Sequence, residues 1–252
     1  MRDDGLKGRV FLVTGSGRGL GAALARAAGT EGAKVVVNCR GNMRAAETTA
    51  AEVRRAGGEA LPLRADVSDV AEARTLVEQT LSTWKGIDVL VNTVGGFNWK
   101  GLCELEPAEW RRVLATNLDS IHHMCRLVIP NMRERRFGRI VNFGAVGASV
   151  ALGEPQMAAY SAAKAAVVAL SKALALEEAR AGITVNVVSP GLLRDESGSK
   201  AAAAADAMLG DRVPVGYAGR AEDVVRAVLF FASPAADYVT GQVLEVAGGA
   251  RV

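Results

Sequence analysis

Tyr160 and Lys164 are the first and last residues of YSAAK, within an alanine-rich segment. On an α-helix these positions are one turn apart, so the phenol and the ammonium group share a face. An isolated phenol has a pKa near ~10 and is a poor acid at neutral pH, whereas a nearby ammonium group lowers that pKa. The pair therefore indicates proton transfer by Tyr160. A packed tyrosine beside an exposed lysine is the alternative interpretation.

A second group of residues, the glycines of TGSGRGLG (Thr14–Gly21), has the spacing G-x-x-x-G-x-G. Glycine permits a tight turn and brings backbone N–H groups close to a pyrophosphate, which the positive end of a following helix also favours. Glycine turns occur without ligands too, but a position between a first strand and a first helix favours a dinucleotide site. The predicted contacts are Gly15, Ser16, Arg18, Gly19, Leu20 and Gly21.

The end of the next apolar run discriminates between NAD(H) and NADP(H). An acidic residue about 20 residues past a glycine turn would bind the ribose 2′-hydroxyl of NAD and repel a 2′-phosphate. This chain has Asn38 there, followed by Arg40, and Arg18 lies in the glycine turn. Two guanidinium groups suit a dianionic 2′-phosphate, so we expect NADP(H) to be preferred, with NAD(H) as the alternative. The preference does not follow if both arginines are only exposed surface charges.

Short apolar runs that read as strands alternate with amphipathic helical patterns along the whole chain. The predicted strands are Arg9–Thr14, Lys34–Asn38, Leu61–Ala65, Ile87–Asn92, Arg139–Phe143, Ile183–Val188 and Gln242–Val246. The predicted helices are Leu20–Thr30, Met43–Ala56, Val70–Trp84, Pro107–Arg135, Met157–Ala181 and Glu222–Ala232. Most strands lack strict alternation, as expected where helices cover both faces of a parallel sheet. The pattern predicts one α/β domain over residues 1–252, a doubly wound parallel sheet of the Rossmann type.

The composition argues against several other classes of protein. The net charge is only +3, and we interpret the one dense arginine cluster, within residues 133–139, as solvated helix-end charge rather than a nucleic-acid patch. Three widely spaced cysteines suggest neither a disulfide framework nor a zinc site, and the adjacent His122 and His123 diverge on a helix. No apolar run approaches a membrane span, and the N-terminus is too charged for a signal peptide. We expect a cytoplasmic protein with no metal, membrane or nucleic-acid partner.

Taken in order, the motifs resemble those of the short-chain dehydrogenase/reductase family, in particular its 3-oxoacyl-[acyl-carrier-protein] reductases. TGSGRGLG matches TGxxxGxG, NTVGG is similar to N-N-A-G, YSAAK matches the active-site helix, and SPGLL resembles the loop beside the nicotinamide. The resemblance covers essentially the whole chain. It implies reduction of a ketone to a secondary alcohol with NADPH, 3-oxoacyl thioesters being one candidate class. It also implies that the helices Pro107–Arg135 and Met157–Ala181 pair across two-fold axes, giving a homodimer or homotetramer.

The same resemblance implies a role for each site residue. Tyr160 would deliver the proton, Lys164 would hold the nicotinamide ribose and lower the pKa of Tyr160, and Asn117 would hold a proton-relay water. The further cofactor contacts would be Asp66 and Val67 at the adenine, together with Asn92, Gly95, Pro190, Gly191 and Leu193.

The chain departs from the family pattern at the catalytic serine, whose position is occupied by Ala145. Losing one hydrogen-bond donor to a developing oxyanion typically costs roughly 10²–10³ in rate. Ser149 or the segment Phe97–Trp99 could supply a donor instead, or the chain could bind a dinucleotide without catalysis. Asp195 replaces a threonine that usually binds the carboxamide, and residues 192–215, which include KAAAAADAM, are expected to form a mobile substrate loop.

Overall fold

The computed structural model describes residues 5–194 and 213–250. Seven parallel strands form one sheet in the order β3-β2-β1-β4-β5-β6-β7. The strands are β1 (Val10–Val13), β2 (Lys34–Cys39), β3 (Glu59–Arg64), β4 (Val89–Asn92), β5 (Gly138–Phe143), β6 (Ile183–Pro190) and β7 (Val243–Val246). The predicted doubly wound sheet is confirmed, and the strand order reverses between β1 and β4. In such sheets ligands bind at the carboxyl ends of the strands, where the order reverses.

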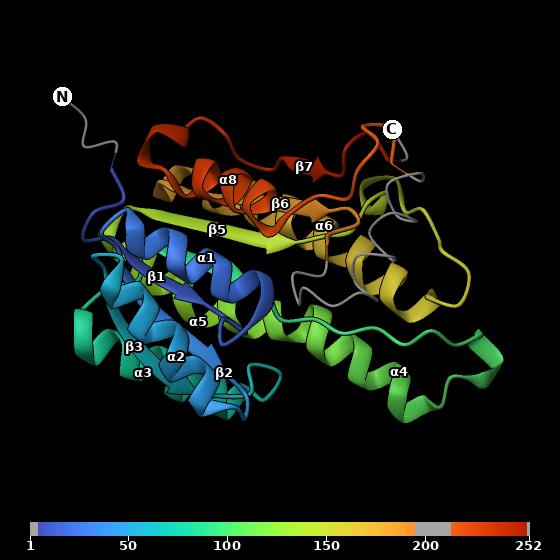
Figure 1. Cartoon of the computed structure of the whole chain (residues 1–252), viewed down its shortest axis with the longest axis horizontal. Helices are drawn as coiled ribbons and strands as arrows, with labels where there is room; N and C mark the ends of the chain where they lie inside the picture. The colour runs from blue at the N-terminus through green and yellow to red at the C-terminus, as the bar shows by residue number, and fades with distance from the viewer. Residues whose placement is uncertain (1–4, 195–212, 251–252) are drawn as a thin grey trace.

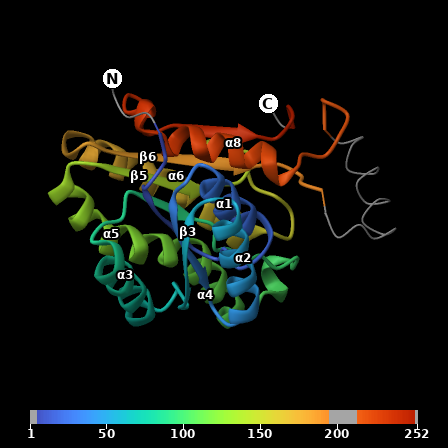
Figure 2. The same ribbon diagram turned by 60° about the vertical axis from the view of Figure 1, so that its left-hand side comes forward.

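Helices cover both faces of the sheet (Figures 1 and 2). The helices are α1 (Gly19–Thr30), α2 (Met43–Arg55), α3 (Val70–Trp84), α4 (Pro107–Leu114), α5 (Ser120–Arg135), α6 (Ala158–Glu178) and α8 (Ala221–Ala232). Successive residues of β2 point to opposite faces: Val35 and Val37 belong to the core under α1, α2 and α8, and Val36 belongs to the core under α3, α5 and α6. All of these β2 residues are fully buried, which explains the absence of polar alternation in the sequence.

The predicted helix Pro107–Arg135 is interrupted by a π-helical turn, Ala115–Asp119, between α4 and α5. Asn117 lies within this turn, and its Nδ2 donates to the carbonyl of Val113 at 3.0 Å. An asparagine side chain that bonds the backbone four residues earlier competes with the helix's own hydrogen bonds. The prediction of one uninterrupted helix is therefore wrong at this point, and π turns of this kind are frequent at functional sites.

Helix α6 and its short 3₁₀ extension, Ala158–Ala181, form one helical segment long and apolar enough to cross a membrane by length and composition alone. The expectation that no apolar run approaches such a span is wrong in that respect. The buried side of α6, including Val167 and Ala175, packs on the sheet within the core shared with α3 and α5. Its apolar character is thus accounted for by core packing.

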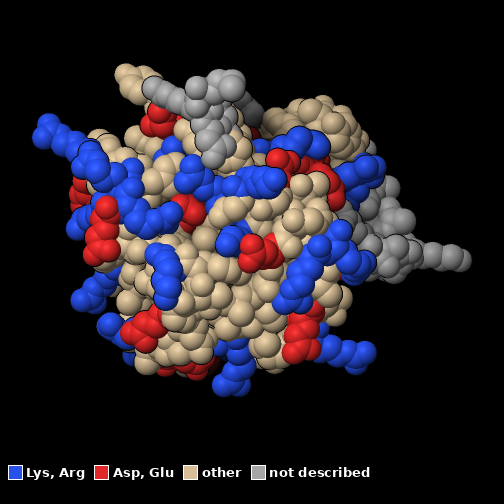
Figure 3. Space-filling model, turned by 90° about the vertical axis from the view of Figure 1, so that its left-hand side faces the viewer, with Lys and Arg blue, Asp and Glu red and all other residues tan. Residues whose placement is uncertain are grey.

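The arginine cluster predicted to be solvated is largely engaged in contacts within the protein. Arg133 pairs with the buried Glu178, Arg135 pairs with the buried Asp88, and Arg139 is itself 2% exposed and donates to backbone carbonyls. The interpretation as solvated helix-end charge is wrong for the buried Arg139, whereas Arg133 and Arg135 are exposed in the last turn of α5 in addition to pairing. Figure 3 shows the end of the molecule at the amino termini of the strands, where basic and acidic side chains are interspersed.

Candidate active site

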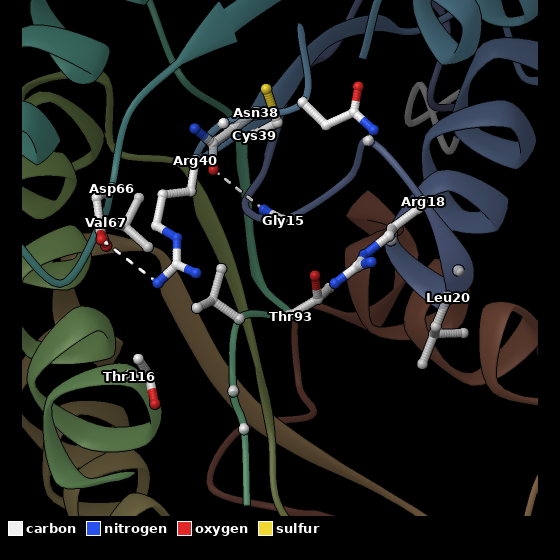
Figure 4. Close-up of a pocket in the computed structure, with 18 of the residues that line it drawn as sticks. Gly15, Arg18, Leu20, Asn38, Cys39, Arg40, Asp66, Val67, Thr93 and Thr116 are labelled. Carbon is white, nitrogen blue, oxygen red and sulfur yellow. Dashed lines mark hydrogen bonds and ion pairs between the residues drawn. The ribbon is translucent and has the colours of Figure 1, made fainter. Parts of the chain in front are cut away.

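A cavity of about 750 Å³ lies at the carboxyl ends of β1 to β4, where the strand order reverses. Its walls come from the turns that follow these four strands and from the start of the π turn (Figure 4). Ten residues predicted from the sequence line it: Gly15, Arg18, Gly19, Leu20, Gly21, Asn38, Arg40, Asp66, Val67 and Gly95. The structure therefore brings most of the predicted cofactor contacts to one place.

The glycine turn that follows β1 has no room for side chains at two of its glycines. A Cβ at Gly21 would lie 2.7 Å from the Gly15 carbonyl oxygen, and Gly15 itself has a φ of +64°, with a Cβ position 3.0 Å from Val94. Helix α1 begins in this turn, and its N-cap residue, Arg18, makes no side-chain capping hydrogen bond. The first N–H groups of α1 thus receive no capping bond from the Arg18 side chain. This leaves them available to an anion bound at the helix N-terminus.

The side chains of two residues predicted to contact the cofactor hold the glycine turn to the sheet. Ser16 is fully buried, and its hydroxyl donates to the Val13 carbonyl at 2.6 Å. Asn38 is 1% exposed: its Oδ1 accepts from Gly15 N–H at 3.0 Å, and its Nδ2 donates to the Ala65 carbonyl at 3.1 Å. Because these bonds occupy the amide group, Asn38 supports the turn rather than offering its side chain to a ribose.

The two arginines predicted to bind a 2′-phosphate lie on different sides of the cavity (Figure 4). Arg40 follows β2 and lies 3.8 Å from a carboxylate oxygen of Asp66, with its own side chain 72% exposed. The same carboxylate accepts from the hydroxyl of Ser68 at 2.6 Å. The position at the end of β2 is not acidic, as the sequence shows, but a carboxylate from the turn after β3 lies nearby, because Asp66 pairs with Arg40.

The turn after β4 contributes residues that the sequence analysis did not single out. Thr93 lines the cavity, and its N–H donates to the hydroxyl of Thr14 at 3.1 Å, which ties the β4 turn to the β1 turn. The sequence did offer a signal for Thr93, because it directly follows a buried strand, β4, at the point where the strand order reverses.

Asn92, predicted to contact the cofactor, has a buried side chain. Its Nδ2 donates to Asn142 Oδ1 at 2.8 Å, and Asn142 in turn donates to Ser171 on α6 at 2.9 Å.

Asn117, Gly95 and Lys164 meet at the edge of the cavity. Asn117 is fully buried, and its Nδ2 donates to the Gly96 carbonyl at 2.6 Å. Its Oδ1 is buried without a hydrogen-bond partner among the residues that the structure describes. A Cβ at Gly95 would lie 2.5 Å from this oxygen and 3.6 Å from Lys164 Nζ. The glycine thus leaves a space in which an acceptor and a cation face each other, as a bound hydroxyl or water would require.

Tyr160 and Lys164 share one face of α6, as predicted, with Lys164 Nζ 5.5 Å from the centre of the phenol ring. Lys164 is 4% exposed, its Nζ donates to the Phe143 carbonyl at 2.7 Å, and burial lowers its pKa to about 8. Burial raises the pKa of the Tyr160 phenol. Lys164 makes no opposing contribution to this shift, so the lowering of the Tyr160 pKa by Lys164 stays a prediction.

Ala145, at the expected serine position, is partly buried against Ala148, Val168 and Val187. Ser149, the considered substitute, is exposed on a short 3₁₀ turn (Ala148–Val150) and does not line the cavity. Gly147 anchors this loop, because its N–H donates to the Glu245 carboxylate on β7 at 2.8 Å. The loop is thus well fixed, and Ser149, the one hydroxyl residue between Gly144 and Met157, is exposed.

The remaining predicted residues lie at the carboxyl end of β6. Pro190 ends that strand, the Gly191 N–H donates to the Val246 carbonyl at 2.9 Å, and Leu193 packs against the core under α8. None of the three lines the cavity. Asp195 and most of the expected substrate loop, residues 195–212, lie outside the described residues. Within residues 5–194 and 213–250, no group of three or more His, Cys, Asp or Glu could hold a metal ion.

Comparison with known proteins gives matches over nearly the whole chain. The family described as Enoyl-(Acyl carrier protein) reductase matches residues 15–251. The 3-oxoacyl-[acyl-carrier-protein] reductase of Haemophilus influenzae is 38% identical over 244 residues, 97% of this chain and 98% of that protein. The 3beta-hydroxysteroid dehydrogenase 1 of Eggerthella lenta is 37% identical over 249 residues, 98% and 95% of the two chains. A solved short-chain dehydrogenase/reductase variant from Serratia marcescens is 31% identical, with a TM-score of 0.89 over 98% of this chain and 99% of that one.

Proposed function

The chain belongs to the short-chain dehydrogenase/reductase family, and from this we propose that it reduces a ketone to a secondary alcohol with NADPH. It is an oxidoreductase that acts on CH–OH or C=O groups and resembles 3-oxoacyl-[acyl-carrier-protein] reductases. The observation that supports the proposal most strongly is the meeting of Gly95, Asn117 and Lys164 at the edge of a cavity large enough for a dinucleotide.

The residues of the cavity fit a dinucleotide. The glycine turn and the uncapped start of α1 would hold the pyrophosphate, and Asp66 and Val67 would hold the adenine. Lys164 and the unpartnered Oδ1 of Asn117 would face the ribose and a water. When bound, the reduced nicotinamide supplies a hydride to the carbonyl carbon.

Tyr160 would donate the proton that the reduced oxygen needs. Because burial raises the pKa of Tyr160, the phenol is protonated at neutral pH, which is the form a donor requires. Lys164, with a pKa of about 8, is still mostly protonated at neutral pH and would stabilise the phenolate left behind. Asn117 would connect the pair to solvent through a water held at its Oδ1.

Oxidation of NADPH in the presence of ketones tests this function. The ketone panel includes 3-oxoacyl thioesters and cyclic ketones, because one relative is named for 3-oxoacyl-[acyl-carrier-protein] and the other for a hydroxysteroid, whose oxidised form is a cyclic ketone. Tyr160→Phe is expected to lower kcat at least about 10²-fold while NADPH still binds, because only the proton donor is lost. Turnover that is unchanged in Tyr160→Phe would contradict the assigned proton donor.

The preference for NADPH depends on Arg40, which is mostly exposed at the cavity and pairs at 3.8 Å with Asp66. Replacement of this pair by contact with a 2′-phosphate would give a charge-assisted hydrogen bond. Arg40→Ala is therefore expected to weaken NADPH binding about 10- to 100-fold and NADH binding little, as measured by calorimetry. Arg74→Ala, an exposed change on α3, is the control. Equal losses for both nucleotides in Arg40→Ala would rule out the 2′-phosphate contact.

A second candidate function follows from Ala145. If nothing replaces the serine hydroxyl that Ala145 lacks, the chain would bind a dinucleotide as a sensor or as a partner in an assembly. Binding of NADPH without any Tyr160-dependent turnover across the ketone panel would favour this alternative. Intact Asn117, Tyr160 and Lys164 favour the enzyme.

We further propose a cytoplasmic homodimer or homotetramer. Helices α5 and α6 present the faces that would pair across two-fold axes. Multi-angle light scattering of the purified chain distinguishes these states from a monomer.

A further inference from the structure

Two aromatic rings stand exposed beside the proposed proton donor. Phe97 and Trp99 follow β4 and are 51% and 61% exposed, with ring centres 5.7 Å apart and ring planes at 89°. Phe97 also lines the cavity, and its ring centre is 5.8 Å from that of Tyr160. The two perpendicular rings therefore form a corner that begins at the phenol of Tyr160 and extends toward solvent.

The segment that carries these rings is fixed from two sides. Lys100 Nζ donates to both carboxylate oxygens of Glu109 at 2.8 Å, and Asn98 Nδ2 donates to the same carboxylate at 3.4 Å. The hydrogen bond from Lys100 holds the pKa of Glu109 below its usual range, so this carboxylate stays ionised. On the other side, the Lys100 N–H donates to the Gln156 carbonyl at 3.0 Å, which joins the segment to the loop before α6. The corner is thus held in place without a ligand.

We propose that Phe97 and Trp99 form a wall that binds the apolar ring of a cyclic ketone whose carbonyl lies at Tyr160. This inference rests on the proposed function, since it places the substrate in the same site. Exposed aromatic side chains gathered at a cavity mark a binding surface more than scattered apolar residues do. Contact between Phe97 and Tyr160 fixes the wall relative to the proton donor.

A ring fits this wall better than a linear chain of equal size. Contacts between aromatic rings add roughly 2- to 10-fold in affinity beyond the area they bury, and the perpendicular pair offers both a face and an edge to the fused benzene ring of a ketone such as β-tetralone. A linear chain also loses the freedom of several bonds on binding, whereas a rigid ring does not. The wall should therefore select cyclic over linear ketones of the same carbon number.

The steady-state test compares β-tetralone with 2-decanone, which have equal carbon number. Trp99→Ala is expected to raise KM for β-tetralone about tenfold while changing kcat and the KM for 2-decanone less than about threefold. Phe97→Leu, which keeps apolar bulk, is expected to act in the same direction. Tyr238→Ala removes a ring that is 99% exposed elsewhere and serves as the control. Equal changes in KM for both ketones would overturn the wall.

A binding measurement separates the wall from the proposed reaction. Calorimetry of β-tetralone with the NADP⁺ complex of Tyr160→Phe reports affinity where no turnover occurs. Adding Trp99→Ala to that variant should weaken binding about tenfold. If Trp99→Ala weakens β-tetralone binding but the wild-type protein reduces no ketone, the proposed binding wall is supported and the proposed function is contradicted. If ketones are reduced in a Tyr160-dependent way but Trp99→Ala leaves the β-tetralone affinity unchanged, the proposed function is supported and the binding wall is contradicted.

Discussion

Lys164 is a cation held in a buried position, and its surroundings explain its altered acidity. Its Nζ has the Phe143 carbonyl at 2.7 Å as a partner but no carboxylate within ion-pair distance among the residues that the structure describes. Burial disfavours the charged form and lowers the pKa to about 8. The charge of Lys164 is therefore present at neutral pH and is lost in the mildly alkaline range.

This pKa predicts how nucleotide binding depends on pH. The protonated lysine attracts the nucleotide, so NADPH affinity should fall only about twofold between pH 7 and 8, as half of the lysine loses its proton, and then by up to about tenfold per pH unit. Tyr160 does not account for the change, because its own pKa is raised. Calorimetry across pH 7 to 9.5 measures it. The inflection should vanish in Lys164→Met and persist in Lys172→Met, an exposed lysine on the same helix. An inflection that survives Lys164→Met would assign it to another group.

Ala145 marks the other feature of the site that depends on one residue. Ala145→Ser restores a hydroxyl to a partly buried position, where it could donate to the substrate oxygen. If the carbonyl has no other donor, kcat for the reduced ketone should rise by on the order of 10²-fold. Ala148→Ser adds a hydroxyl within the same small cluster and should not raise it. An unchanged kcat in Ala145→Ser would show that the site already has a donor.

At the scale of elements, the π turn and the turn after β4 together position Asn117. The turn after β4 supplies the Gly96 carbonyl that accepts from Asn117 in the π turn, and α4 supplies the Val113 carbonyl that also accepts from it. Both amide hydrogens of the side chain are then used, and its Oδ1 points toward Gly95 and Lys164. Neither element alone would fix this orientation.

Gly95→Ala is expected to disable the site without unfolding the protein. The added Cβ would lie 2.5 Å from Asn117 Oδ1, so the amide must turn away from Lys164. We expect kcat to fall at least about tenfold, since misplacement of positioning groups by about 1 Å can cost 10²-fold. Gly96→Ala is a matched control, because nothing lies within 4 Å of its Cβ position. Equal losses in both variants would point to the backbone of the turn instead.

The elements themselves were predictable to different degrees. Buried parallel strands such as β2 appear as unbroken apolar runs, so their places in the chain follow from the sequence. The π turn does not, because the side chain of Asn117 within it bonds the Val113 carbonyl of the same helix and also the Gly96 carbonyl of a turn far away in the sequence. The roles of Asn38 and Asn92 were also missed, since an amide that binds the protein and one that binds a ligand look alike in sequence.

At the scale of the whole molecule, the sheet separates chemistry from stability. The carboxyl ends of the strands carry the cavity, the glycine turn and the aromatic wall. The amino ends carry buried charges that join elements far apart in sequence, including the pair Arg133–Glu178 between α5 and α6. Changes at the amino ends should therefore alter stability with little effect on the site, and changes at the carboxyl ends should do the reverse.

Asp88 tests this separation. Its carboxylate, 4% exposed, accepts from the Val10 N–H at 2.7 Å and from Arg135 at 2.6 Å, and so joins β1, β4 and α5. Asp88→Ala leaves a buried N–H without its acceptor, and it removes an ion-pair partner from Arg9 and Arg135, whose side chains are 25% and 35% exposed. Urea denaturation should show a loss of about 2–4 kcal/mol, the partial exposure of Arg135 keeping the cost below that of a fully buried pair. NADPH affinity of the folded variant should be unchanged. Glu78→Ala, an exposed change on α3, should alter stability by less than about 0.5 kcal/mol. Weaker NADPH binding by folded Asp88→Ala would mean that the two ends of the sheet are coupled.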